Sequence, residues 1–116
     1  MDIETFRSFC LSLPDTHEQM PFKGFFRESR SILVFYIGKK MFCLFDIDRF
    51  DACTIKCDSD KISEMKDHYT AVGPPFNLSP KYWISVKFND DLPDPELFKL
   101  IEESYALVKK SLPKKV

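Results

Sequence analysis

The stretch "SILVFYIGKKMFCLFDI", residues 31–47, decides the fold class. Two runs rich in β-branched and aromatic residues flank Gly38-Lys39-Lys40, a pattern typical of a β-hairpin. Strict alternation in the second run puts Phe42 on the opposite face from Cys43. Both faces of the hairpin are apolar, so both are expected to be at least partly covered. A second layer of the fold or a dimer partner could provide that cover.

Helices and further strands follow outward from this hairpin. Asp2 and Pro14 bound a first predicted helix, and the polar segment 15–30 is interpreted as a loop with an extended piece around Pro21 to Phe26. After the hairpin, the sequence predicts a strand in "DACTIKC" (51–57), a helix in "DSDKISEMKDHY" (58–69), a strand in "KYWISVKF" (81–88) and a helix from Asp94 to about Leu112. These elements do not alternate as βαβ units. We therefore expect an α+β domain with an antiparallel sheet and helices packed on it.

Composition restricts the classes of function. The 116 residues suit a single domain, 1–116, and are 44% hydrophobic with a net charge of −1. The near-neutral balance lacks the basic footprint of a typical nucleic-acid-binding domain, so any electrostatic attraction must be local. No apolar signal segment follows Met1 and no apolar run approaches the ~18 residues that span a membrane. We expect a cytoplasmic protein with no membrane contact and with its four cysteines reduced.

The chain contains none of the common catalytic or phosphate-binding signatures: no HExxH, GxSxG, P-loop or GxGxxG. Cys53 and Cys57 would lie about 13 Å apart on one face of a strand, too far for a disulfide between them, and no CxxC pair accompanies them. "DIDRFD" lacks the glycine and the glutamate of a calcium loop. We expect a non-enzymatic protein with no cofactor, no metal and no catalytic residue, although an active site assembled in space stays open.

The strand expected at 81–88 carries the only tryptophan. Alternation places Tyr82 on a core face with Ile84, Val86 and Phe88, and a row of Lys81, Trp83, Ser85 and Lys87 on the other face. Such a row can stack a base and hold phosphates. It can equally be a tryptophan packed on a neighbouring strand beneath lysine stems. Lys39 and Lys40 at the hairpin tip supply a second basic point.

Several segments together resemble the MmcQ/YjbR-like family of small bacterial proteins. The segments are "EQMPF" (18–22), "GKKMFCLF" (38–45), "TIKCD" (54–58), "PPFNLSPKYWISV" (74–86) and "IEESYALVKKSLPKK" (101–115), and they occur in the family's order over nearly the whole chain. In the fourth segment, where the family has two histidines, this chain has Asn77 and Tyr82, whereas Lys81 and Trp83 are kept. A family pocket built on those imidazoles would be changed here.

The resemblance implies a two-layer α-β(3)-α-β(2)-α fold similar to CyaY-like or secretion-chaperone-like domains, with Phe22 to Phe26 as the favoured additional strand. It also implies DNA binding, although for much of the family that label is an analogy from the fold. The first hypothesis is a weak, largely sequence-nonspecific DNA-binding protein with a contact row of Lys81, Trp83 and Lys87, flanked by Lys39 and Lys40. The alternative is a protein-interaction or homodimerising module that uses apolar sheet surface. A third hypothesis is a small-ligand pocket around Asn77, Trp83 and Tyr105.

Overall fold

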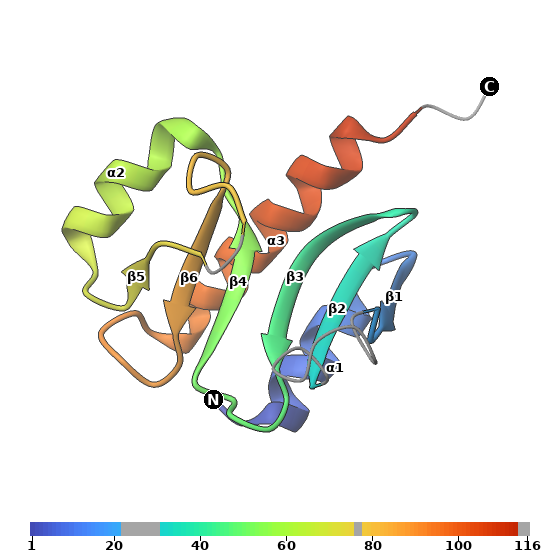
Figure 1. The fold of residues 1–116 in the computed structure, drawn as a ribbon, viewed down its shortest axis with the longest axis horizontal. Coiled ribbons are helices and arrows are strands. Elements are labelled where there is room, and N and C mark those ends of the chain that lie inside the picture. Colours follow the sequence, from blue (N-terminus) through green and yellow to red (C-terminus); the bar gives the residue numbers. More distant parts are fainter. Residues whose placement is uncertain (22–30, 76–77, 114–116) are drawn as a thin grey trace.

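The structure is a computed structural model that describes residues 1–21, 31–75 and 78–113. In these residues three helices and six strands follow one another along the chain (Figure 1). Their order is α1 (Ile3–Ser12), β1 (Thr16–Gln19), β2 (Ile32–Ile37), β3 (Lys40–Asp46), β4 (Ala52–Lys56), α2 (Ser59–His68), β5 (Val72–Gly73), β6 (Trp83–Lys87) and α3 (Asp94–Ser111).

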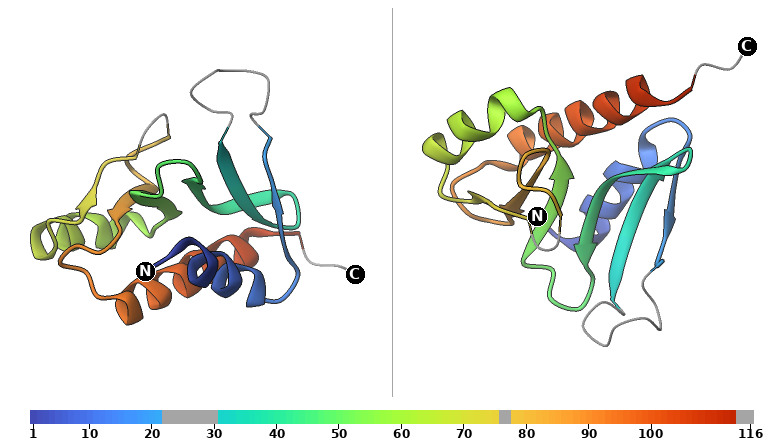
Figure 2. Two further views of the ribbon diagram at one scale, coloured as in Figure 1. Left: turned by 90° about the horizontal axis from the view of Figure 1, so that it is seen from below. Right: turned by 45° about the horizontal axis from the view of Figure 1, so that its top comes forward.

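The six strands form one sheet in the order β1-β2-β3-β4-β6-β5, and every neighbouring pair is antiparallel. Helices α1 and α3 lie side by side against one face of this sheet, and α2 lies beside the short strand β5 (Figures 1 and 2). The expected α+β class, with helices packed on an antiparallel sheet, is confirmed. Because β4 pairs with β6 across α2 and β5, residues far apart in the sequence become neighbours.

Four strands precede α2, one more than the resemblance implies. The additional strand, β1, occupies polar residues that were interpreted as loop, and that interpretation was wrong. Its two faces differ: Glu18 points towards α1, where Arg7 pairs with it, and His17 stacks on Tyr36 of β2 at 5.4 Å between ring centres. From Phe22 on, the extended piece expected around Pro21 to Phe26 lies outside the described residues.

A β-bulge in β3 changes which side chains face the helices. Phe35 lies opposite Cys43 and Tyr36 lies opposite Met41, so Phe42 is an extra residue in β3. Phe42 is completely buried, and its ring meets the edge of Tyr105 of α3 at 5.6 Å. The expectation that Phe42 faces away from Cys43 was therefore wrong, because the bulge lets both side chains join the core.

The core lies between the sheet and the helices. From β4, β6 and α3 it takes Cys53, Ile55, Ile84, Val86, Leu97, Ile101 and Val108. Burial, together with the neighbouring thiols of Cys10 and Cys53, raises the pKa of the Cys43 thiol well above its ordinary value. All four cysteines are free and buried, as expected.

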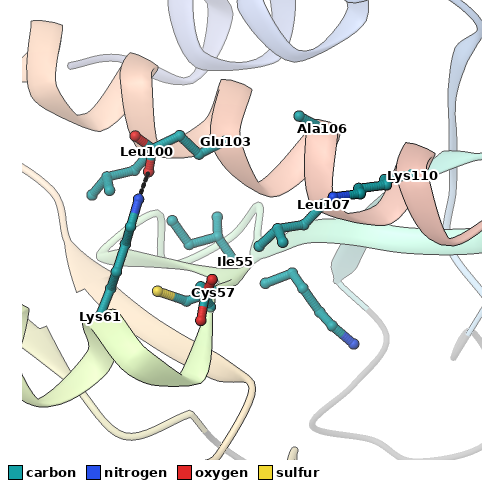
Figure 3. Close-up of a pocket in the computed structure, with 10 residues that line it drawn as sticks. Ile55, Cys57, Lys61, Leu100, Glu103, Ala106, Leu107 and Lys110 are labelled. Carbon is teal, nitrogen blue, oxygen red and sulfur yellow. Dashed lines mark ion pairs between the residues drawn. The ribbon is translucent and has the colours of Figure 1, made fainter.

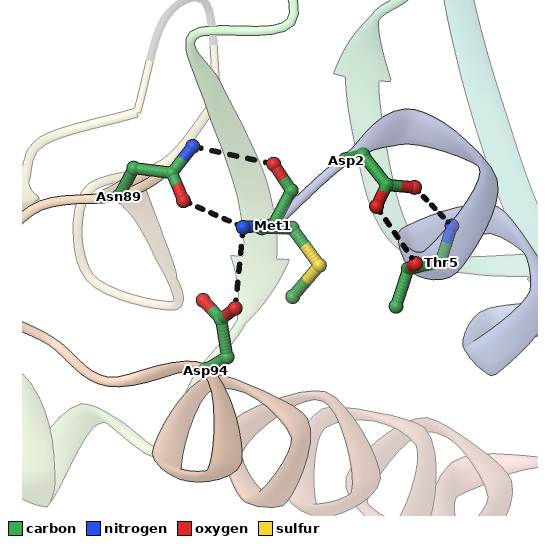
Figure 4. Close-up of polar contacts among 5 residues, drawn as sticks. All are labelled: Met1, Asp2, Thr5, Asn89 and Asp94. Carbon is green, nitrogen blue, oxygen red and sulfur yellow. Dashed lines mark hydrogen bonds and ion pairs between the residues drawn. The ribbon is translucent and has the colours of Figure 1, made fainter.

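Hydrogen bonds and an ion pair connect Met1 to Asn89 and to Asp94 at the start of α3 (Figure 4). The Met1 amino group donates a hydrogen bond to Asn89 Oδ1 at 2.6 Å and lies 3.2 Å from Asp94 Oδ2. Asn89 Nδ2 donates in return to the Met1 carbonyl at 3.2 Å. Asp2 then caps α1 by accepting from the Thr5 amide at 2.8 Å. These contacts fix how α1 lies next to α3 beneath the sheet.

Candidate functional site

A cleft of about 580 Å³ lies at one end of the sheet, where β4 ends and β6 begins. Lys56 is the last residue of β4 and lies opposite Trp83, the first residue of β6. The start of β3 and the last turns of α3 reach the same end. The cleft is lined, among others, by Lys40, Met41, Lys56, Tyr82, Trp83 and Ser111.

Trp83 is not part of the core that Ile84 and Val86 join, but its side chain is covered. Only 7% of it is exposed, and Lys56 Nζ lies 5.1 Å from the centre of its ring. At this distance the ammonium group is held by the ring's π face, and the lysine stem excludes water from the indole. Trp83 is therefore a wall of the cleft and the anchor of Lys56.

Tyr82 lies on the surface, and the expectation that it belongs to the core was wrong. Its side chain is 44% exposed. The reason is that β6 begins only at Trp83, whereas Tyr82 belongs to a turn in which the amides of both residues donate to the Ser79 carbonyl. Alternation along a strand cannot be extended to a residue in the turn before it.

Two ammonium groups lie close to the exposed Tyr82 ring. Lys56 Nζ and Lys81 Nζ are each 5.6 Å from the ring centre. A partly exposed aromatic ring with two cations beside it combines an apolar stacking surface with two nearby positive charges. Planar bases joined by phosphates have the complementary chemistry.

The other predicted cations are spread more widely. Lys87 is exposed on the same sheet face as Trp83, but it pairs with Ala52 at the opposite end of β6, about 13 Å along the strand. Lys39 is exposed in the turn after Gly38, whose φ of 62° allows that tight hairpin connection. Lys40 lines the cleft, and its amine donates to the Ser111 carbonyl and hydroxyl at 3.3 and 3.2 Å. Lys40 therefore binds the end of α3.

Of the residues of the predicted ligand pocket, Tyr105 does not line the cleft. Tyr105 is 8% exposed, and its hydroxyl donates to the Pro14 carbonyl at 2.6 Å, which ties α3 to the end of α1. Asn77 lies outside the described residues.

Sequence reasoning missed Lys56 and Tyr82 as members of the site. Alternation within β4 already places Lys56 on the same face as Thr54, away from the buried Cys53 and Ile55. That signal could have marked Lys56 as surface-facing. It could not have placed Lys56 beside Trp83, because α2 and β5 separate the two strands in sequence.

Groups suited to metal binding or nucleophilic chemistry are not assembled in the described part of the chain. No cluster of three or more His, Cys, Asp or Glu side chains there could hold a metal ion. In the segment "DIDRFD", Asp46 accepts hydrogen bonds from the Ser31 hydroxyl and from the amides of Asp48 and Arg49, which stabilises the turn after β3. Cys57 lines the cleft, but burial and nearby carboxylates raise its pKa, so the thiol stays protonated and is a poor nucleophile.

The described helices include none that is long and apolar enough to cross a membrane.

Comparison with known proteins gives one family and a set of similar structures. The family model YjbR matches residues 11–107. The chain is similar to a Deinococcus radiodurans protein with the domain DUF419, whose crystal structure matches with a TM-score of 0.83. The two sequences are 29% identical, and the match covers 97% of this chain and 82% of that one. A Pseudomonas syringae protein also matches. Its crystal structure shows 21% sequence identity and a TM-score of 0.75, covering 92% of this chain and 98% of that one. Its solution structure shows 18% identity and a TM-score of 0.74, covering 99% of this chain and 98% of that one. No curated protein matches the chain.

Proposed function

The chain belongs to the YjbR family, and from that premise we propose that it is a non-enzymatic protein that binds DNA weakly and with little sequence preference. The family membership confirms the resemblance found in the sequence. DNA binding and the likeness to CyaY-like domains remain parts of the proposal. We place the protein in the cytoplasm, where its buried cysteines would stay reduced.

The exposed Tyr82 ring, with the amines of Lys56 and Lys81 near it, carries this proposal. A base would stack on Tyr82, and the phosphates on either side of that base would meet the two lysines. Stacking requires a base that is free of its partner strand, so single-stranded DNA is the favoured form. Compared with the sequence-based hypothesis, the stacking ring moves from Trp83 to its neighbour, and Lys56 joins the contact row.

From Tyr82 the strand would continue along β6. Trp83, Ser85 and Lys87 share the outer face of that strand, and the Lys87 amine is exposed at its far end. Lys39 flanks the cleft from the hairpin turn. Because the whole chain has a net charge of −1, only these local lysines attract phosphate, and the affinity should be low and sensitive to salt.

The test compares Tyr82→Leu with Tyr82→Phe in binding to a short dye-labelled single strand and to a duplex, followed by fluorescence anisotropy. Phenylalanine keeps the stacking ring and removes only the hydroxyl, so it is the matched control. Base–aromatic stacking contributes ~1–3 kcal/mol, so Tyr82→Leu should weaken single-strand binding at least about fivefold, while Tyr82→Phe stays close to wild type. Equal affinity of all three proteins, or no binding by wild type at low salt, would contradict the proposal.

The alternative, a homodimer through the outer face of the hairpin, also has a structural basis. Ile32, Tyr36, Met41 and Leu44 are partly exposed on that face, and no helix of the described residues covers it (Figure 2). Salt separates the two functions, because an apolar dimer persists at high salt whereas phosphate contacts do not. Sedimentation at several protein concentrations in high salt should give a rising mass if the face pairs, and a constant monomer mass if it does not.

A further inference from the structure

A second hollow, of about 250 Å³, lies between α3 and the segment that links β4 to α2 (Figure 3). Ile55 and Leu107 lie near its middle, and Leu100 and Ala106 add further apolar surface from α3. An engineered apolar cavity of ~150 Å³ accepts benzene, so a hollow of about 250 Å³ can hold a small molecule somewhat larger than benzene. It is smaller than typical pockets for drug-sized ligands, which begin at about 300 Å³.

The charged groups around this hollow are three lysines and two carboxylates, which leaves one positive charge in excess. The carboxylates are both engaged. Glu103 pairs with Lys61 at 3.9 Å, and Asp58 caps α2 by accepting from the Asp60 amide at 3.0 Å. The remaining amines belong to Lys56 and Lys110, and neither has a carboxylate within 4.0 Å in the part of the chain that the structure describes. An apolar interior with two such cations at its border complements a ligand with an apolar body and an anionic head.

We propose that this hollow binds a small amphipathic carboxylate. A short aliphatic chain would lie on Ile55 and Leu107, and the carboxylate would sit at the Lys110 amine with Lys56 nearby. The hollow shares Lys56, Cys57, Asp58 and Leu107 with the cleft beside Trp83. Its apolar interior and Lys110 lie outside the proposed DNA contacts, so the proposal does not rest on DNA binding. A cationic amphiphile of equal length should be excluded, because the border already carries excess positive charge.

The shape of the hollow favours a small molecule over a peptide. The Lys61–Glu103 ion pair joins α2 to α3 at one side of the hollow, as the dashed line in Figure 3 shows. A peptide running along α3 would have to pass this pair, whereas a short chain can end against it. The volume of about 250 Å³ also suits one short chain better than several side chains.

The experiment titrates the ¹⁵N-labelled protein with sodium octanoate and follows the backbone amides by NMR, with octylamine and 1-octanol as ligands of equal chain length. Saturable shifts are expected at Cys57, Leu107 and Lys110 at millimolar octanoate, as suits a ligand of this size. Octanol should bind more weakly, and octylamine should not give these shifts.

Lys110→Met removes the charge and keeps the apolar stem, and Lys109→Met is the matched control. Lys109 is the next residue on α3, but its amine lies over the Tyr105 ring at 5.7 Å and does not line the hollow. Octanoate affinity should fall about threefold to tenfold in Lys110→Met and less than twofold in Lys109→Met. Absence of saturable shifts, equal shifts with octylamine, or equal effects of the two variants would overturn the proposal. Both lysines are exposed, so both variants should fold.

Discussion

The salt dependence of DNA binding can be worked out from the lysines that the structure leaves accessible. Lys56, Lys81 and Lys87 lie on or beside the outer face of β6, whereas the Lys40 amine is already bound to the end of α3. Counting three phosphate contacts, the logarithm of the single-strand association constant should fall with the logarithm of salt with a slope of about −2. Affinity should therefore drop about twentyfold between ~50 and ~200 mM salt.

Lys56→Met is the informative perturbation, because it removes one charge and keeps the stem that covers Trp83. With two contacts left, the slope should become about −1.4 and the loss over the same salt range about sevenfold. Lys99→Met is the control, since Lys99 lies on α3 and pairs with Glu96. Anisotropy of a dye-labelled oligothymidylate of about 12 nucleotides is the assay, because tryptophan fluorescence would itself change when Lys56 is replaced.

The reasoning fails if the wild-type slope is close to zero, because phosphates would then play no part in any binding. It also fails if Lys56→Met and Lys99→Met change the slope equally. In that case the change in slope would come from the net charge of the protein and not from contacts made by Lys56 beside Tyr82 and Lys81.

Two further predictions concern stability, measured by urea titration. Ser104→Ala should lower the free energy of unfolding by about 1–3 kcal/mol, because its buried hydroxyl donates a hydrogen bond to the Phe42 carbonyl at 2.8 Å. The control Ser12→Ala removes an exposed hydroxyl and should change the free energy of unfolding by less than about 0.5 kcal/mol. Hydrogen bonds from the Thr70 and Ala71 amides lower the pKa of the Asp91 carboxyl group below 3.8. The ionised carboxylate therefore stabilises the fold above about pH 4, and this stabilisation is lost as the pH falls through the folded-state pKa. Asp91→Asn should therefore lose less stability than wild type between about pH 5 and about pH 2, and a parallel loss in both proteins would refute this assignment.

Much of the architecture was predictable because its signals are local. The hairpin of β2 and β3 and the helix that begins after Asp2 are both predicted from neighbouring residues, and the structure confirms them. Strand β1 escaped prediction because its residues are polar. It is a strand because β2 offers it an edge and Arg7 of α1 binds its Glu18.

The candidate site was only half predictable. Periodicity separated Trp83 from the core residues Ile84 and Val86, but it could not tell that a lysine from another strand would cover the ring. It also gave Tyr82 to the core, because the point at which a strand begins depends on the turn before it.

The sequence by itself determined the class of the fold, the helices and most of the core, since hydrophobic period, caps and turn residues act over a few residues. Tertiary structure alone decided the pairing of β4 with β6, which puts Lys56 beside Trp83, and the bulge that turns Phe42 towards α3. Both depend on packing between segments that are remote in sequence or on different layers. The charges and rings of the candidate site therefore come together only when the sheet forms.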